Sequence, residues 1–343
     1  MTKRPPAPTP ESRPVVLITW PDFDVALPGG RTDLERAGLE VRYAPRLRER
    51  SPDELTDLLW GAVAAIVSTD PFTAEVLAAS PQLQVIARVG VGFDSIDVDE
   101  ANRVGVMVTT TSGANETTVA DHTLALMLAA TRRITEHDRN VKAGKWLRTG
   151  DQMSWLLTGA TVGLVGYGAI GRLVAQRLRG FDTRILVSDP AFHGDGHVEA
   201  VSLEDLLVRS DIVSLHAPLL PSTRGLIGTR EIGLMKRTAM MINTGRGGIV
   251  SETALAVALR EHRIRYAGID VFDREPPGSS DLLALDNAVL TPHVAGVSEA
   301  SVAEMVERAA MSVLDTVSGR VPRNVVNPQA VPAWESRRKT SNA

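Results

Sequence analysis

Short apolar runs alternate with segments of helical periodicity through residues 15–110. The apolar runs predict buried strands at residues 15–20, 39–43, 64–68, 84–88 and 106–109. Segments with the spacing of an amphipathic helix lie between them, at residues 32–37, 52–59, 73–79 and 96–103. Strands that alternate with helices are typical of a doubly wound parallel sheet, so an α/β lobe is predicted here.

The same alternation returns after residue 160 and predicts a second lobe of the same class. Its apolar runs predict strands at residues 161–165, 184–188, 212–215, 239–242, 265–269 and 288–290. A helix is expected at 115–133, and its apolar residues cover nearly the whole circumference, so it should be buried, between the two lobes. We interpret Asp121 and His122 on it as core or interface polar groups rather than catalytic ones. Residues 134–158 are expected to be an irregular link.

A glycine-rich turn follows the first strand of the second lobe. Gly166 permits a tight turn, Gly168 lets the backbone approach a pyrophosphate, and Gly171 lets helix and strand pack closely. The helix N-terminus offers unpaired N–H groups to the phosphates. Asp189 stands 18 residues after Gly171, where a carboxylate can accept hydrogen bonds from adenosine ribose hydroxyls. Glycines also recur in ordinary turns, but strand, turn, helix and acid together predict a dinucleotide site.

Four later strands of this lobe end in polar residues. The ends carry His216, then the segment Asn243 to Gly248, then Asp270 with Glu275 shortly after it, and finally His293. In an open parallel sheet, ligands bind outside the carboxyl ends of the strands. One such residue alone would more often be a capping or turn group, but four ends together predict a single crevice.

Arg246, Glu275 and His293 have the chemistry for hydride transfer to a 2-oxo acid. Arg246 offers a bidentate fork that can hold a carboxylate and polarise a ketone. His293 can donate or accept the proton, and Glu275 beside it would orient the ring and favour its charged form. In the first lobe, Val89-Gly90-Val91-Gly92 follows a strand and can form an anion-binding nest of N–H groups. A tight turn that leads into the next helix is an equal alternative for this segment.

Composition narrows the possible classes of protein. The chain has 343 residues and a net charge of −4, and its basic residues are scattered, so no nucleic-acid partner is expected. The basic residues at 46–50 and 337–339 are interpreted as solvated surface and tail. No cysteine is present, which excludes disulfides and thiolate sites, and no metal site is expected. Residues 1–13 are expected to be a disordered tail without the apolar core of a signal peptide, and no segment is long enough to span a membrane, which favours the cytoplasm.

Five motifs along the second lobe resemble the D-isomer-specific 2-hydroxyacid dehydrogenases. They are LVGYGAIGR, SLHAPLLPSTRGLIG, MMINTGRGGIV, YAGIDVFDREPP and LTPHVAGVSE. The resemblance covers about residues 15–325 and implies two doubly wound domains, a Rossmann cofactor domain inserted into a flavodoxin-like substrate domain. It implies a substrate domain at 14–110 and 298–325, an NAD domain at 111–297, a C-terminal tail at 326–343, and a homodimer.

The family's functional residues map onto this chain one by one. Arg246, Glu275 and His293 match the catalytic arginine, glutamate and histidine, and Val89 to Gly92 match the loop that binds the substrate carboxylate. Asp270 matches an aspartate on the nicotinamide side. The residues expected to bind NAD are Gly166, Tyr167, Gly168, Ala169, Ile170, Gly171, Asp189, Pro190, His216, Ala217, Pro218, Thr223, Asn243, Thr244, Asp270, His293 and Gly296.

Departures from the family pattern bear on the substrate. The sequence of the chain is most similar to phosphoglycerate dehydrogenase relatives. However, the segment 67–73 is shorter than the corresponding segment of those enzymes and lacks the arginine and lysine suited to a phosphate. Asp70 is expected to repel a dianion there, so a non-phosphorylated hydroxy acid is at least as well supported. A C-terminal regulatory domain is not expected.

The sequence also allows a function other than catalysis. The alternative to an enzyme is a non-catalytic NAD-sensing protein, because transcriptional corepressors use the same fold. Formate dehydrogenase is disfavoured, since its relatives carry glutamine in place of Glu275.

Overall fold

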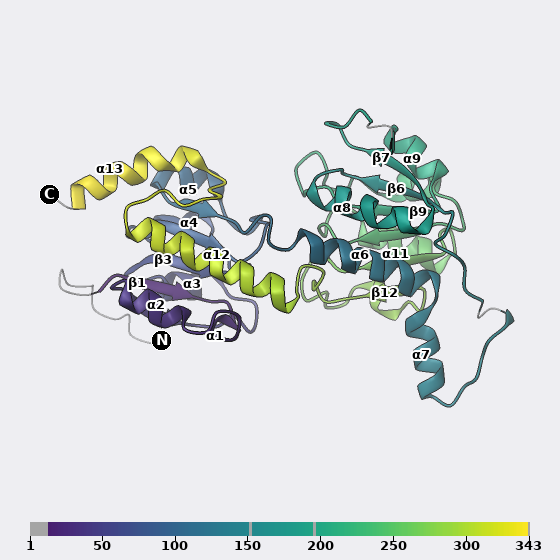
Figure 1. Cartoon of the computed structure of the whole chain (residues 1–343), viewed down its shortest axis with the longest axis horizontal. Coiled ribbons are helices and arrows are strands. Elements are labelled where there is room, and N and C mark those ends of the chain that lie inside the picture. Colours follow the sequence, from purple (N-terminus) through teal and green to yellow (C-terminus); the bar gives the residue numbers. More distant parts are fainter. Residues whose placement is uncertain (1–12, 151–152, 195–196, 342–343) are drawn as a thin grey trace. The chain divides into compact units, whose positions relative to one another are not determined.

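Two parallel β-sheets organise the chain in the computed structural model, which describes residues 13–150, 153–194 and 197–341. Each sheet belongs to its own compact unit (Figure 1). The first lobe runs to Asn115 and resumes at Ser298, and the second lobe runs from Glu116 to Val297. The expected N-terminal tail lies outside the described residues, except for Arg13.

The first lobe has a five-stranded sheet in the order β2-β1-β3-β4-β5. The strands are β1 (Val15–Ile18), β2 (Glu40–Tyr43), β3 (Ala62–Val67), β4 (Val85–Arg88) and β5 (Met107–Thr109). The helices are α1 (Phe23–Ala26), α2 (Gly30–Arg36), α3 (Pro52–Leu58), α4 (Ala74–Ala78), α5 (Val98–Val104) and α12 (Glu299–Val317). The strand pleat sends Val16 and Ile18 into a core under α1, α2 and α12, and sends Leu17 into a core under α3, α4 and α5. The sequence-based expectation of a doubly wound sheet is confirmed.

The expectation of a C-terminal tail from residue 326 was wrong, because residues 328–341 are helical. A short turn, η4 (Pro328–Ala330), leads into α13 (Val331–Ser341), which belongs to the first lobe. Trp334 is 1% exposed in the core under α12, and its Nε1 donates a hydrogen bond to Gln84. Arg337, expected to be solvated, donates to the carbonyl oxygens of Val104 and Leu83, and burial lowers its pKa. The sequence misled because most residues of this helix are polar and its one large apolar anchor is Trp334.

The second lobe has a seven-stranded sheet in the order β12-β11-β10-β9-β6-β7-β8. The strands are β6 (Thr161–Val165), β7 (Arg184–Ser188), β8 (Glu199–Ala200), β9 (Ile212–Leu215), β10 (Met240–Asn243), β11 (Tyr266–Ile269) and β12 (Ala288–Leu290). The helices are α6 (Glu116–Thr131), α7 (Ile134–Lys142), α8 (Ala169–Leu178), α9 (Leu203–Arg209), α10 (Thr229–Leu234) and α11 (Glu252–Arg260), with short 3₁₀ turns at η2 (Arg179–Phe181) and η3 (Asp281–Ala284). The chain starts in the middle of the sheet at β6, builds outward to β8 and then returns to β9. The crevice between β6 and β9 is therefore a topological switch point.

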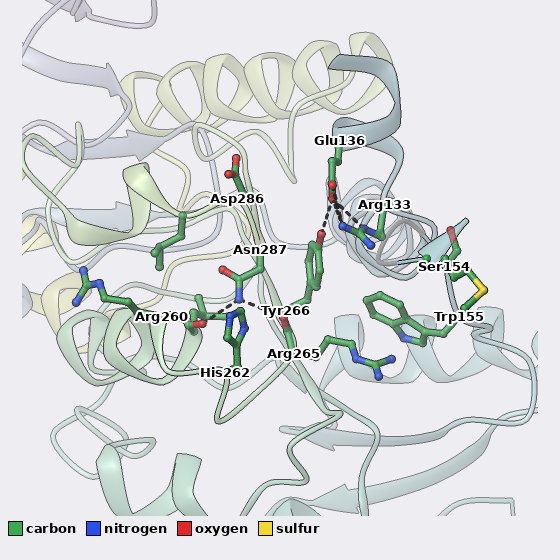
Figure 2. A pocket seen from close by; sticks show the side chains of 14 residues that line it. Arg133, Glu136, Ser154, Trp155, Arg260, His262, Arg265, Tyr266, Asp286 and Asn287 are labelled. Carbon is green, nitrogen blue, oxygen red and sulfur yellow. Dashed lines mark hydrogen bonds and ion pairs between the residues drawn. The ribbon is translucent and has the colours of Figure 1, made fainter. Parts of the chain in front are cut away.

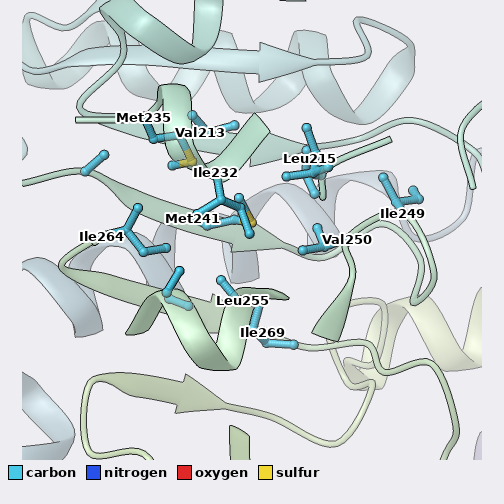
Figure 3. Packing of buried hydrophobic residues seen from close by; sticks show 14 of the residues in the cluster. Val213, Leu215, Ile232, Met235, Met241, Ile249, Val250, Leu255, Ile264 and Ile269 are labelled. Atoms are coloured by element: carbon cyan, nitrogen blue, oxygen red, sulfur yellow. The ribbon is translucent and has the colours of Figure 1, made fainter. Parts of the chain in front are cut away.

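Apolar side chains on both faces hold this sheet between helices. Figure 3 shows part of one cluster, in which Val213, Met241 and Ile269 from three strands meet Leu255 from α11. On the other face α6 packs against α8 and β11, and Ala120, Met127 and Ala130 are fully buried. The nearly all-round apolar character of α6 thus matches burial within the second lobe.

Residues 134–142 correct the expectation of an irregular link. They form α7, a helix with no buried residue, in which Ile134 and Val141 are more than half exposed. Only Ile134 and Val141 are apolar in this helix, too few for the stripe that marks a core-facing helix in a sequence. No helix in the described ranges is long and apolar enough to cross a membrane.

Candidate active site

The glycine-rich turn between β6 and α8 has the geometry that its spacing predicts. Gly166 has a φ of +93°, and a Cβ atom there would lie 2.8 Å from the backbone nitrogen of Ala217. A Cβ on Gly171 would lie 2.5 Å from the carbonyl oxygen of Gly166. A Cβ on Gly168 would meet nothing within 4 Å, so this part of the turn faces open space. A bare backbone beside open space and a helix N-terminus fits a pyrophosphate.

Asp189 at the end of β7 ties the glycine turn to the neighbouring strand. Its Oδ2 accepts a hydrogen bond from the backbone N–H of Tyr167 at 2.7 Å, and its Oδ1 accepts one from the N–H of Ala191 at 2.8 Å. Each carboxylate oxygen can accept a further hydrogen bond. The arrangement leaves acceptors for a pair of ribose hydroxyls next to the turn.

The loop after β9 begins with a histidine that stays neutral. His216 Nε2 lies 2.9 Å from the hydroxyl of Ser214, and its Nδ1 is shut off from solvent with no hydrogen-bond partner. Burial lowers the pKa of His216 to about 4, so the ring carries no charge near neutral pH. Further along, Thr223 donates to the carbonyl of Pro218 and accepts from the N–H of Leu220, which closes this loop on itself. We therefore assign no proton-transfer role to His216.

Arg246 lies in the loop after β10. The side chain of Asn243, at the end of that strand, forms hydrogen bonds with the loop backbone. The side-chain amide of Asn243 donates to the carbonyl of Arg246 at 3.0 Å and accepts from the N–H of Gly245 at 3.1 Å. Thr244 is buried and its hydroxyl lies 2.8 Å from that of Thr123 on α6. These hydrogen bonds hold the conformation of the loop, and Arg246 is only partly buried.

Asp270 at the end of β11 organises the segment that carries His293. Its fully buried carboxylate accepts hydrogen bonds from the hydroxyl of Thr291 and the N–H groups of Val294 and Ala295, at 2.6, 2.9 and 2.9 Å. The backbone oxygen of Asp270 accepts from the N–H of His293 at 2.8 Å. His293 itself has a φ of +53°, a left-handed conformation that is uncommon for a residue other than glycine. The bonds to Asp270 hold this unfavourable backbone in place.

His293 and Glu275, which the sequence placed after two strands of the same edge, are in hydrogen-bond contact. Nδ1 of His293 lies 2.7 Å from Oε2 of Glu275, and both side chains are rather more than a third exposed. Burial alone would raise the pKa of Glu275, but the hydrogen bond and charge of His293, the N–H of Phe272 and the charge of Arg246 outweigh it and lower that pKa. Glu275 is therefore ionised at neutral pH, and Nε2 is the ring nitrogen left for a substrate.

His122 contributes to this network, although the sequence pointed only to a buried polar group. Its Nε2 lies 3.1 Å from the hydroxyl of Thr291 and 3.6 Å from Oδ1 of Asp270. Asp121, the other polar residue considered on α6, pairs instead with Arg177 of α8. Thr291 was given no site role from the sequence, because nothing in the sequence distinguishes it from an ordinary polar residue at the end of a strand.

The loop at Val89 to Gly92 in the first lobe only partly fits an anion nest. The N–H of Val89 donates to the carbonyl of Val67, and the N–H of Gly90 donates to the hydroxyl of Thr111. Among the described residues, the N–H groups of Val91 and Gly92 have no partner. Two donors rather than four are thus available, and the φ of +141° at Gly90 shows why glycine stands there.

A cavity of about 740 Å³ in the second lobe lies away from these residues. Figure 2 shows Tyr266, Trp155 and Glu136 on its wall, with the hydroxyl of Tyr266 donating to Glu136. Its lining includes Tyr266, at the start of β11, and Asn287, just before β12. The candidate catalytic residues follow the other ends of these strands, so the cavity is not their site.

The sequence and fold of this chain are similar to those of known proteins. Residues 124–295 match the family model "D-isomer specific 2-hydroxyacid dehydrogenase, NAD binding domain". Glyoxylate reductase from Korarchaeum cryptofilum is 44% identical over 277 residues, which cover 78% of this chain and 83% of the relative. The TT0316 protein from Thermus thermophilus has a TM-score of 0.84 and 37% identity, over 91% of this chain and 99% of that one. D-lactate dehydrogenase from Aquifex aeolicus, solved with NAD and lactic acid, has a TM-score of 0.79 and 28% identity, over 93% and 97%.

Proposed function

The chain belongs to the D-isomer-specific 2-hydroxyacid dehydrogenase family, and we propose that Arg246, Glu275 and His293 are the residues with which it interconverts 2-oxo and 2-hydroxy acids. It is an NAD-dependent oxidoreductase that acts on the CH–OH group. The observation that carries the assignment is the 2.7 Å contact between His293 Nδ1 and Glu275 Oε2. It joins a titratable ring to an ionised carboxylate at the carboxyl edge of the second-lobe sheet, where open α/β sheets bind ligands.

The proposed roles follow from the chemistry of each side chain. The glycine turn and Asp189 would hold NAD(H), whose nicotinamide would supply or accept the hydride. Arg246 holds the substrate carboxylate with its planar fork and polarises the carbonyl. In the first lobe, the N–H groups of Val91 and Gly92 are proposed donors to a substrate carboxylate. His293 gives a proton from Nε2 to the substrate oxygen during reduction and takes it back during oxidation. Glu275 orients the ring through Nδ1 and stabilises its charged form.

Cofactor binding by the remaining residues is part of the same proposal. Gly166, Gly168 and Gly171 bring the backbone to the pyrophosphate, and Asp189 accepts from the ribose. Pro190, Ala217, Pro218, Thr223, Asn243, Thr244 and Gly296 lie in the loops after the strands that carry these motifs. The support is the open space at Gly168 and the unused acceptor capacity of Asp189.

The substrate class we propose is a small 2-oxo acid, and glyoxylate is the first compound to test, since a relative with 44% identity is named glyoxylate reductase. The test is NADH oxidation by the purified full chain with a panel of 2-oxo acids. Turnover that is lost in His293→Ala, with NADH binding retained, supports the proposal. Tight NADH binding without turnover of any 2-oxo acid would contradict it and favour the non-catalytic NAD-sensing alternative.

We also propose that the chain is a homodimer formed through the second lobe. Apolar side chains that are 48–75% exposed gather in one segment of that lobe: Ile134, Val141, Trp146, Leu147, Met153 and Leu156. Exposed apolar groups in such number mark protein contacts. Light scattering after size-exclusion chromatography should give twice the chain mass, and Trp146→Ser should shift the protein toward monomer. A wild-type monomer at micromolar concentration would contradict this.

A further inference from the structure

Arg46 corrects the interpretation of residues 46–50 as solvated surface. It lies in the loop after β2, and its backbone N–H donates to the carbonyl of Thr19 just after β1. Its Nη1 donates to the hydroxyl of Thr69, just after β3, at 2.7 Å. Arg46 is only partly exposed and its Nε is buried without a hydrogen-bond partner. A guanidinium from the loop after β2 is therefore held at the end of β3, on the other side of β1.

The neighbouring Arg50 removes the repulsion that Asp70 was expected to cause. Asp70 is fully buried, accepts from the hydroxyl of Thr19 at 2.7 Å, and pairs with Nη1 of Arg50 at 2.5 Å. The side chain of Arg50 is only 10% exposed, so this pair is closed within the lobe. The expectation that Asp70 repels a dianion is therefore wrong, because its charge is neutralised and buried.

Arg46, Arg50 and Asp70 together carry two positive charges and one negative charge. Arg50 is matched by Asp70, whereas no carboxylate among the described residues pairs with Arg46. Most arginines that form ion pairs in the described part of the chain lie on the surface, as Arg48 does with Glu54. Among the described residues, Nη2 of Arg46 donates to no acceptor, so this arginine has both a charge and a donor group available for an anion.

The position of Arg46 relates this capacity to the substrate. β3 and β4 are neighbours, with Val67 paired to Arg88, and the N–H of Val89 donates to Val67 at 2.8 Å. Thr69 thus follows one strand end, and the loop with the free N–H groups of Val91 and Gly92 follows the next. Both belong to the first lobe, so this relationship does not depend on the other lobe.

We propose that Arg46 and Thr69 form a subsite for a second anionic group of the substrate. The inference rests on the proposed function, in which Val91 and Gly92 help to bind the carboxylate next to the oxo group. A carboxylate or phosphate at the far end of the substrate would accept hydrogen bonds from the guanidinium and the hydroxyl. The preferred substrates are then 2-oxo acids with an anionic tail. Arg46 replaces, from another strand, the basic residues that are missing from residues 67–73.

The test compares substrates with and without the tail. Rates of NADH oxidation are measured with glyoxylate, oxaloacetate and 3-phosphohydroxypyruvate for the wild type, Arg46→Ala, Arg46→Lys and Arg48→Ala. Arg46→Ala should lower kcat/KM for a tailed substrate roughly ten- to a hundredfold more than for glyoxylate, the range of charge-assisted hydrogen bonds. Arg46→Lys should lie between it and the wild type. Arg48→Ala removes a nearby arginine whose side chain is 74% exposed, so it should leave the substrate ratio unchanged.

The outcomes separate this inference from the proposed function. A selective loss with oxaloacetate alone identifies a carboxylate tail, and one with 3-phosphohydroxypyruvate alone identifies a phosphate. Equal losses with all three substrates would show that Arg46 only braces the loop, and would overturn the inference while the enzyme assignment stands. If no substrate turns over, the subsite is tested by calorimetry, which measures the binding of 2-hydroxy acids to the NADH-bound chain. Tighter binding of D-malate than of D-lactate, abolished in Arg46→Ala, supports the subsite, and equal binding overturns it.

Discussion

Glu275 Oε2 lies 2.7 Å from His293 Nδ1, although the two residues follow different strands of the second-lobe sheet. The carboxylate remains ionised at neutral pH because its pKa is lowered by His293, the Phe272 N–H and Arg246 against the effect of burial. The pair therefore fixes which ring nitrogen faces a substrate and places a negative charge beside it.

Glu275→Gln should move the pH dependence of reduction. The amide keeps the shape but removes the charge that favours the protonated ring, so the ring should lose its proton at lower pH. Reduction needs that proton, so its rate should begin to fall about one pH unit earlier as pH rises. The oxidation limb should move in the same direction. Profiles of kcat/KM against pH check this, and unchanged profiles would show that Glu275 only supports the loop.

Arg246→Lys should lower activity by roughly a hundredfold or more. Lysine keeps the charge but lacks the planar fork, and the loss is comparable to removing one preorganised donor at a reacting centre. NADH affinity, measured by fluorescence titration, should change little. Near-normal turnover, or a defect confined to NADH binding, would take Arg246 out of the substrate site.

Asp189 should make the enzyme prefer NADH to NADPH. Its carboxylate would lose ribose hydrogen bonds and repel a 2′-phosphate, which is worth about 1.5–3 kcal/mol on the scale of hydrogen bonds to a charged group. The ratio of kcat/KM for the two cofactors measures this. Asp189→Asn should narrow the ratio, because the amide oxygen can still accept one hydrogen bond while the charge is gone. Equal efficiency of the wild type with NADPH would disprove the assignment.

Asp270→Ala should cost both stability and activity. The change leaves the Thr291 hydroxyl and the N–H groups of Val294 and Ala295 without their acceptor and releases the strained backbone of His293. Unsatisfied buried donors cost about 1–3 kcal/mol each, so the free energy of unfolding should fall by at least about 2 kcal/mol. Urea denaturation checks stability, and turnover at a temperature where the variant stays folded checks activity. Full activity with unchanged stability would mean that other contacts position His293.

The sequence alone was sufficient to predict the two parallel sheets and the residues at the carboxyl edge of the second one. Apolar runs identify parallel strands because both faces of such a sheet are buried, and the ends of those strands must share an edge. Gly166 and Gly171 were identified for the same kind of local reason, since a tight turn excludes a Cβ atom in any protein that contains it. His293 and Glu275 could be paired because each follows a strand of that one edge.

Only the tertiary structure decided which groups that are distant in the sequence pair with each other. The local pattern of apolar and polar residues does not indicate these pairs. Asp70 is neutralised by Arg50 from the loop after β2, and the N–H of Gly90 is taken by Thr111 rather than left for an anion. Asp270 gathers three donors from residues 291–295 that hold the left-handed backbone of His293, and Trp334 anchors a helix where a tail was expected. Hydrogen bonds and ion pairs depend on atoms that only folding brings together, and the charge available at each strand end is set by those partners rather than by the residue type.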